Sequence, residues 1–323
     1  MKLNRGQLLA CFVVALTLAF QLTVARAQPD TLKQIVPGVW FREGNFAEGH
    51  SNNVIIEMRD YLVIVDANFP GGAKRVLEDA KRLTSKPIKY VFDTHHHGDH
   101  IYGNAVFTRL GAVTIAHAGV LDEMRGSEPR GWQAAMKRRP DVAELGLNEP
   151  EPPRETFKDK PYVLKDATRT IEFRFFGWAH TRGDGFAWLP KEKVLCTGDA
   201  VVNGPYNYTG DGNVMNWPEV IRAAQRLQPR HILPGHGGAG GEELMAGQLR
   251  FFVELQNAVS GAVKQGKKIG EIVTIENGRA TATTIKLPES VKNWTGGFLP
   301  MQVYDTWREV TGHKPAGAIK NGQ

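Results

Sequence analysis

The stretch DTHHHGDH, from Asp93 to His100, decides how this sequence is interpreted. It places four histidines and two aspartates within eight residues. So many ionisable side chains at one point of the chain would repel one another or stay unsatisfied without a common partner. In an extended segment, side chains at positions i and i+2 point the same way, so His95 and His97 can reach one metal ion while His96 points elsewhere. The stretch therefore predicts a metal site.

The second half of the same stretch offers ligands for another ion. Asp99 and His100 follow the flexible Gly98, which allows both side chains to turn toward a second position. Imidazole nitrogen and carboxylate oxygen together suit zinc, and iron and manganese are the next options.

Three further candidate ligands lie more than seventy residues away, and they share one feature with the first stretch. Residues 89–94 have the pattern of a buried strand, so the histidine cluster directly follows the end of a predicted strand. His180, Asp199 and His236 also follow predicted strands directly. Because open α/β sheets place their sites beyond the carboxyl ends of strands, these three residues could complete the metal shells.

Short strand patterns alternate with amphipathic helix patterns along the rest of the chain, which is typical of an α/β protein. Strands are predicted at 53–56, 61–66, 89–94, 112–116, 171–175, 186–189, 194–197 and 231–233. Helices are predicted at 72–84, 132–146 and 217–227 and from 245 onward. Asn216 is the expected N-cap of the third helix. The chain after residue 265 has the pattern of a strand pair and a C-terminal helix packed on the main domain.

The first 27 residues differ from the rest, whose composition is that of a globular protein. Lys2 and Arg5 precede an apolar run from Leu8 to Phe20, and Ala25-Arg26-Ala27 has the small-x-small pattern of a signal peptidase site. The apolar run is shorter than the roughly 20 residues that span a bilayer. We therefore predict a cleaved signal peptide, a periplasmic or secreted protein, and no stable membrane anchor.

Charge and cysteine content narrow the possible functions further. The formal net charge is +6, and removal of residues 1–27 takes away three basic residues and no acidic ones. The remaining charge is too small to indicate nucleic-acid binding. Cleavage also removes Cys11 and leaves Cys196 alone, so the mature chain cannot form an internal disulfide. Cys196 lies in a predicted buried strand and is expected to be a core residue rather than a nucleophile.

Five segments together resemble the signature motifs of the metallo-β-lactamase superfamily. They are VIVDANFP (63–70), THHHGDH (94–100), AHTRGD (179–184), TGDAV (197–201) and PGHG (234–237). The match runs in order from about residue 37 to about residue 260. The resemblance implies an α/β fold, a four-layer αββα sandwich with the metals at one edge between the sheets. It implies a single domain over residues 28–323, with a C-terminal extension at 265–323.

The resemblance also implies a ligand set for two zinc ions. His95, His97 and His180 would bind the first ion, and Asp99, His100 and His236 the second. Asp199 would bridge both ions. Asp66 would be the buried aspartate of the first motif, which orients the ligand loop without binding metal.

The implied reaction is hydrolysis. Two zinc ions can hold a bridging hydroxide, because metal binding lowers the pKa of water from 15.7 to about 7. That hydroxide would attack the carbonyl of a small-molecule ester, thioester, lactone or lactam. Asp99 and Asp199 could orient it or carry a proton.

Residue 199 bears on which bond is cleaved. True β-lactamases of the superfamily typically have cysteine or serine where this chain has the bridging Asp199. The set of five histidines and two aspartates is instead similar to that of glyoxalase II and lactonases. Export favours the opposite interpretation, because periplasmic β-lactamases are exported and glyoxalase II normally is not, so a β-lactamase proper stays an alternative.

Two further alternatives come from other classes of protein. An iron-dependent oxidoreductase on the same scaffold would resemble persulfide dioxygenases or flavo-diiron proteins. The complete second ligand group disfavours the former, and the lack of a flavin-binding domain after residue 260 disfavours the latter. A nuclease is disfavoured by the modest charge and the export signal.

Several residues near the motifs are expected to support the site. Phe46, Tyr206 and Tyr208 are expected to border the substrate cavity, with loop packing as the competing role. Asp184 either supports a ligand or caps a loop. Trp178 and Trp188 are expected in the core. Four other histidines are expected to be ordinary structural residues, namely His50, His117, His231 and His313.

Overall fold

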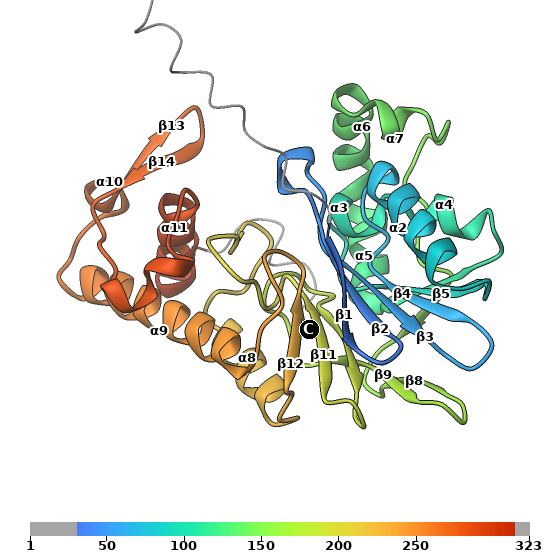
Figure 1. Cartoon of the computed structure of the whole chain (residues 1–323). Coiled ribbons are helices and arrows are strands. Elements are labelled where there is room, and N and C mark those ends of the chain that lie inside the picture. The colour runs from blue at the N-terminus through green and yellow to red at the C-terminus, as the bar shows by residue number, and fades with distance from the viewer. Residues whose placement is uncertain (1–30, 314–323) are drawn as a thin grey trace, which may run out of the picture.

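Two β-sheets face each other in the computed structural model, which describes residues 31–313 (Figure 1). Helices cover the outer face of each sheet, so the layers run helix, sheet, sheet, helix. This is the predicted αββα sandwich. The predicted signal peptide at 1–27 and the last ten residues of the C-terminal extension lie outside the described residues.

The first sheet has seven strands in sequence order. They are β1 (Thr31–Val36), β2 (Val39–Glu43), β3 (Asn53–Glu57), β4 (Leu62–Val65), β5 (Ile88–Asp93), β6 (Val113–His117) and β7 (Glu155–Phe157). Strands β1 to β4 are antiparallel, and β4 to β7 are parallel. Strands β3 and β4, at the positions predicted for strands, form an antiparallel hairpin, and all four residues of β4 are buried.

The second sheet has five strands in the order β12-β11-β10-β9-β8. They are β8 (Tyr162–Lys165), β9 (Thr170–Phe175), β10 (Gly185–Leu189), β11 (Val194–Gly198) and β12 (His231–Pro234). Only the β11–β12 pair is parallel. Strands β10 and β11, at the positions predicted for strands, form an antiparallel hairpin.

The apolar faces of the two sheets form one core. Phe92 of β5 and Phe173 of β9 stack across it, with ring centroids 4.1 Å apart. Cys196 lies in the same core with 1% of its surface exposed, and burial raises the pKa of its thiol. The prediction that Cys196 is a core residue is therefore confirmed.

Helices complete the outer layers. Beside the first sheet lie α2 (Pro70–Leu83), α3 (Gly98–Ile101), α4 (Asn104–Thr108), α5 (Ala118–Gly126), α6 (Glu128–Arg138) and α7 (Pro140–Ala143). Beside the second lie α8 (Trp217–Gln225), α9 (Glu242–Lys264) and α11 (Leu299–Val310). None of the helices within residues 31–313 is both long and apolar enough to cross a bilayer.

The C-terminal segment has the predicted strand pair and helix. Strands β13 (Val273–Glu276) and β14 (Arg279–Thr283) form a hairpin, and α11 packs on α9 and on β14. The short α10 (Ile269–Ile272) and the 3-10 turn η2 (Glu289–Trp294) connect them to the rest, and η1 (Phe46–Glu48) is a similar turn near the N-terminus.

One local prediction is wrong, and another is correct in position only, because Asn216 is the N-cap residue of α8. The single helix predicted at 132–146 is two helices, because Arg139 adopts an extended conformation before Pro140, which begins α7. Asn216 does not cap α8 with its side chain. Its amide instead donates a 2.9 Å hydrogen bond to the Trp178 carbonyl, which ties the helix to the loop that carries His180.

We expect Phe173→Ala to destabilise the fold by about 3–5 kcal/mol, because it leaves a void opposite Phe92 in the core between the sheets. Urea unfolding followed by tryptophan fluorescence would measure the free energy of unfolding. Val163→Ala on the neighbouring β8 is the control, since Val163 is 51% exposed and should change stability by less than about 0.5 kcal/mol. Equal losses in both variants would contradict this assignment of the core.

Candidate metal centre

The predicted ligands come together at one edge of the sandwich. The segment 94–100 leaves β5 of the first sheet, and the segments with His180, Asp199 and His236 follow β9, β11 and β12 of the second. These strand ends meet at the same edge, so residues more than a hundred positions apart become neighbours.

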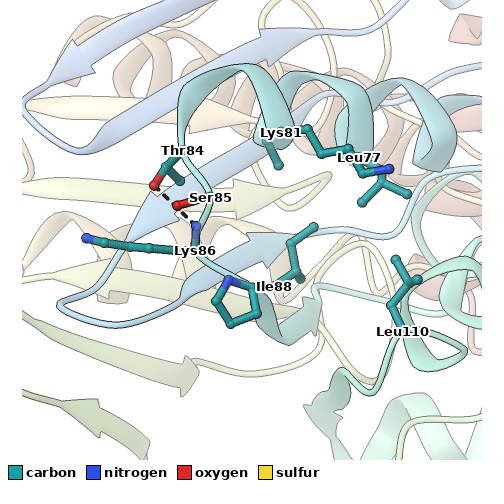
Figure 2. A pocket seen from close by; sticks show the side chains of 9 residues that line it. Leu77, Lys81, Thr84, Ser85, Lys86, Ile88 and Leu110 are labelled. Carbon is teal, nitrogen blue, oxygen red and sulfur yellow. Dashed lines mark hydrogen bonds between the residues drawn. The ribbon is translucent and has the colours of Figure 1, made fainter.

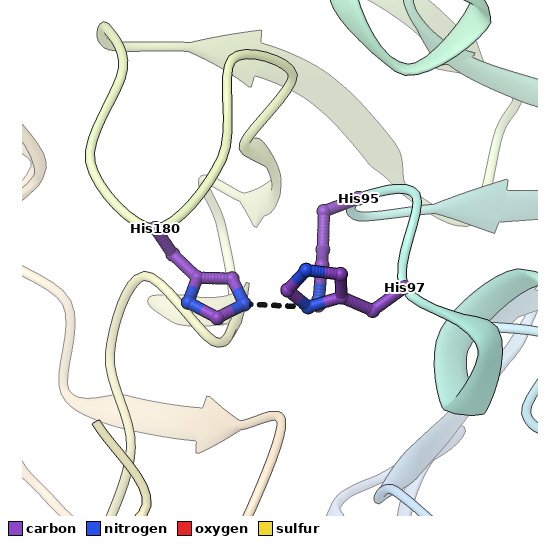
Figure 3. Close-up of side chains that lie close together, drawn as sticks. All are labelled: His95, His97 and His180. Carbon is purple, nitrogen blue, oxygen red and sulfur yellow. Dashed lines mark hydrogen bonds between the residues drawn. The ribbon is translucent and has the colours of Figure 1, made fainter. Parts of the chain in front are cut away.

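Three imidazoles form the first group. His95 Nε2 lies 3.1 Å from His97 Nδ1, and His180 Nε2 lies 2.9 Å from the same atom (Figure 3). His180 Nδ1 donates a hydrogen bond of 2.9 Å to the Tyr208 carbonyl, so its Nε2 carries the free lone pair. The ring nitrogens converge on one point from two sheets, as ligands of one ion would.

Asp99, His100 and His236 form the second group. Asp99 Oδ2 lies 3.1 Å from His236 Nε2 and 3.5 Å from His100 Nε2. Asp199 lies between the groups. Its Oδ1 is 3.5 Å from His100 Nε2, and its Oδ2 is 3.4 Å from His236 Nε2 and 3.7 Å from His180 Nε2.

The donor atoms fit metal ions. His100 Nε2 and Asp199 Oδ1 are buried and have no hydrogen-bond partner among residues 31–313. Buried polar atoms in native proteins are nearly always satisfied, so these two point to a partner other than the chain. Nitrogen and carboxylate oxygen atoms in groups of three or four match the ligand number and type of zinc sites.

Burial and neighbouring charges shift the pKa values of His180 and His100 in opposite directions. Burial and the neighbouring His97 lower the pKa of His180 to about 3, so this ring is neutral. Burial also acts to lower the pKa of His100, but the carboxylates of Asp99, Asp199 and Asp66 raise it to about 9. Protons on His100 thus balance the carboxylates, and metal binding would release them.

Asp66 supports the ligand loop from beneath. Its carboxylate accepts hydrogen bonds from Thr94 N (2.7 Å), from Thr94 Oγ1 (3.0 Å) and from His100 Nδ1 (2.8 Å). The last bond leaves His100 Nε2 free to face Asp99 and Asp199. Asp66 therefore lies where the sequence predicts a residue that orients ligands without being one.

Asp184 caps the loop that carries His180. Its carboxylate accepts hydrogen bonds of 2.7–3.0 Å from the backbone N–H groups of Ala179, His180 and Thr181. It also accepts one of 2.7 Å from the Thr181 hydroxyl. The two roles left open by the sequence are thus combined, because the cap fixes the backbone of a ligand.

Asp211 was not singled out by any motif. Its Oδ2 lies 3.0 Å from His97 Nε2, the ring nitrogen that faces away from the first group. Desolvation would raise the pKa of Asp211, but the hydrogen bond and charge of His97 lower it. The only signal in the sequence is its position in the loop that follows Asp199, and that loop has no regular pattern to place it.

His96 is buried and belongs to neither group, but one of its ring nitrogens lies within 4.8 Å of ligand atoms of His97 and Asp211. Its Nε2 lies 3.7 Å from Glu128, which also accepts a hydrogen bond from Tyr102. The other histidines named above, His50, His117, His231 and His313, belong to none of the groups of converging ligand atoms in the described part of the chain.

A cavity of about 490 Å³ opens above the two groups. Phe46, Tyr206 and Tyr208 line it, which confirms the prediction for these three side chains. Five other lining residues carried no signal in the sequence, namely Phe69, Tyr102, Glu128, Arg138 and Phe298. Trp188 is in the core as predicted. Trp178 is half-buried, and its indole N–H donates a 2.9 Å hydrogen bond to the Asp211 carbonyl.

Another cavity, of about 300 Å³, lies between the end of α2 and the start of β5 (Figure 2). Leu77, Ile88 and Leu110 form its apolar part. The Lys86 ammonium at its rim already pairs with Glu57 at 2.8 Å. None of the candidate ligands lines this cavity, so it is separate from the metal centre.

The chain belongs to the metallo-β-lactamase superfamily. The family model of that name matches residues 47–236, which is more than half of the chain and includes every candidate ligand. The protein is therefore a metal-binding hydrolase of this superfamily, whose members act on small molecules.

Known relatives agree with this assignment. A type 2 metallo-β-lactamase of Bacteroides fragilis is 27% identical over 202 residues, which are 60% of this chain and 72% of that protein. The structure of a metallo-β-lactamase from Pontibacter korlensis superposes with a TM-score of 0.56 at 20% identity, covering 69% of this chain and 99% of that one. The mono-zinc form of FIM-1 from Pseudomonas aeruginosa superposes with a TM-score of 0.53 at 24% identity, covering 71% of this chain and 96% of that one. At such identities the two structures establish the fold.

We expect Gly235→Ala to reduce metal binding strongly, because a Cβ at this position would collide with the Asp199 carboxylate and lie 3.0 Å from the His100 ring. Metal content after dialysis, measured by mass spectrometry, would report the loss. Gly238→Ala is the matched control, since its Cβ would meet nothing closer than 3.8 Å. Full metal content in both variants would contradict the placement of Asp199.

We expect Asp211→Asn to weaken metal binding about 10–100-fold, because the variant removes the carboxylate that holds His97 Nε2. Competition with a chromogenic chelator would measure the affinity. Asp159→Asn, which alters an exposed carboxylate outside the cavity, is the control and should leave affinity unchanged. If Asp211→Asn bound metal as tightly as the control, the proposed support of His97 would be wrong.

Proposed function

We propose that the protein is an exported hydrolase that binds two zinc ions and cleaves an ester, thioester, lactone or lactam. The observation that carries this proposal is the position of Asp199, whose Oδ2 lies 3.7 Å from His180 Nε2 of the first group and 3.4 Å from His236 Nε2 of the second. One group of ligands alone would support a single ion. Two groups joined by one carboxylate support a pair.

The proposed ligands are those implied by the sequence motifs. His95, His97 and His180 hold the first ion, Asp99, His100 and His236 the second, and Asp199 both. When bound, two zinc ions lower the pKa of water toward about 7 and polarise a carbonyl oxygen.

Residues of the chain then orient the reactants and move protons. The side chain of Asp99 is 24% exposed and lines the cavity, so it can accept a proton from the attacking water and return it to the leaving group. Asp199, only 7% exposed, is placed to orient rather than to exchange protons with solvent. Asp66 keeps the His100 ring in one orientation throughout.

The substrate bond is proposed to be an ester, thioester or lactone rather than a β-lactam. A carboxylate stands at residue 199, where the sequence of a true β-lactamase is expected to have cysteine or serine. The resemblance to the Bacteroides fragilis enzyme, a β-lactamase by name, keeps lactam hydrolysis as the second candidate. Residues 1–27, with the pattern of a signal peptide, support export.

We expect two zinc ions per chain in the purified mature protein, about one in His236→Gln, and two in His231→Gln. His231 lies on β12, five residues before the proposed ligand, and belongs to neither group, so it is the matched control. Metal analysis by mass spectrometry gives the stoichiometry. About one iron and no zinc per chain would favour an oxidoreductase and contradict the proposal.

The same preparations should hydrolyse at least one member of a panel of lactones, thioesters, aryl esters and a chromogenic cephalosporin. Asp199→Asn should lower kcat by about a hundredfold or more on any substrate that is cleaved, since both ligand groups lose their common carboxylate. Equal rates for the wild type and this variant would show that the role assigned to Asp199 is wrong.

A further inference from the structure

A second cavity of about 490 Å³ lies next to the metal cavity, on the side of the C-terminal segment. The two cavities share the side chains of Tyr208 and Phe298 and no other lining residue. The two rings contact edge to face, with centroids 6.0 Å apart. The two cavities are therefore adjacent across this ring pair.

The second cavity has mostly apolar walls. Ile275 of β13 and Met301 and Tyr304 of α11 supply large apolar side chains, and Arg279 of β14 supplies an exposed cation. Ile275 is 45% exposed, one of few large apolar side chains so exposed in residues 31–313. The one carboxylate in the wall, Asp305, is buried and already accepts a 2.6 Å hydrogen bond from Thr209. The apolar part of this wall suits an apolar chain.

Most of the wall of this cavity lies outside the residues that the family model matches. The family model ends at residue 236, whereas the walls from Ile275 to Asp305 come from the segment beyond α9. The Tyr208 ring is placed by its own loop, because its hydroxyl end lies against Gly210, where any Cβ would collide with it. The C-terminal segment and this loop thus extend the active-site cavity away from the metals.

We propose that the second cavity holds the acyl chain of the substrate, so that the enzyme prefers long, straight-chain acyl esters or thioesters. This inference rests on the proposed function and names its substrate class. The carbonyl lies in the metal cavity, and the chain crosses Tyr208 and Phe298 into the second cavity. Water adds across the acyl C–O or C–S bond, which gives a carboxylic acid and an alcohol or thiol, and the chain itself does not react.

Chain length is the variable that tests this arrangement. Each methylene transferred from water into an apolar site contributes about 0.8 kcal/mol, which corresponds to about a fourfold gain in affinity. Hydrolysis of acyl esters with one common chromogenic alcohol should therefore rise in kcat/KM by up to about fourfold per added methylene, and level off once the cavity is filled.

Ile275→Asp is the informative variant, with Thr274→Asp as its matched control. Both positions are exposed residues of β13, but only Ile275 lines the cavity. The gain with chain length should persist in the wild type and in Thr274→Asp and be lost in Ile275→Asp, while the shortest ester is cleaved equally by all three. A wild-type rate independent of chain length, or an unchanged gain in Ile275→Asp, would overturn the proposal.

Direct binding separates this inference from the proposed function. Straight-chain carboxylates of increasing length, the products of the reaction, can be titrated calorimetrically into the zinc-loaded protein. If no ester is cleaved but affinity rises with length in the wild type and in Thr274→Asp, and not in Ile275→Asp, the hydrolytic function is wrong and the acyl cavity stands. Affinity independent of length in the wild type overturns the acyl cavity, whichever esters are cleaved.

Discussion

The metal centre depends on the hydrogen bonds of one buried carboxylate, that of Asp66. It accepts hydrogen bonds from the backbone N–H and the hydroxyl of Thr94, where the ligand loop leaves β5. It also accepts a hydrogen bond from the ring of His100, at the other end of that loop. Because β4 and β5 are parallel neighbours, Asp66 and Thr94 end their strands side by side. A single group thus sets where the ligand loop begins and how its last ligand is oriented.

The wall of the metal cavity that includes Tyr208 and Asp211 depends on hydrogen bonds to the C-terminal segment. Gln302 donates to the Asn207 carbonyl at 2.5 Å, Thr209 donates to Asp305, and Glu309 accepts the N–H groups of Val214 and Met215 at 2.9 Å. These bonds hold both ends of the loop that carries Tyr208 and Asp211. A segment outside the matched family region therefore positions the partner of His97 as well as the aromatic wall of the cavity.

Some residues of the site could be predicted from the sequence and others could not, depending on whether nearby or distant segments position them. His95 and His97 could be found because they follow the end of a predicted strand within a dense cluster of histidines, and Asp66 because it belongs to a motif. Asp211 could not, since the loop that places it is shaped by α11, almost a hundred residues later. Arg138 could not either, because Pro140 breaks the predicted helix and only the resulting turn of α6 and α7 sets the cavity wall.

A carboxylate at residue 199 has a geometric consequence that a thiolate would not have. The two oxygens of Asp199 face different neighbours, Oδ1 toward His100 and Oδ2 toward His180 and His236. A cysteine offers one sulfur in place of these two oxygens. The carboxylate has room to turn because residue 235 has no side chain. Gly235 therefore leaves the space in which the Asp199 carboxylate lies between the two ligand groups.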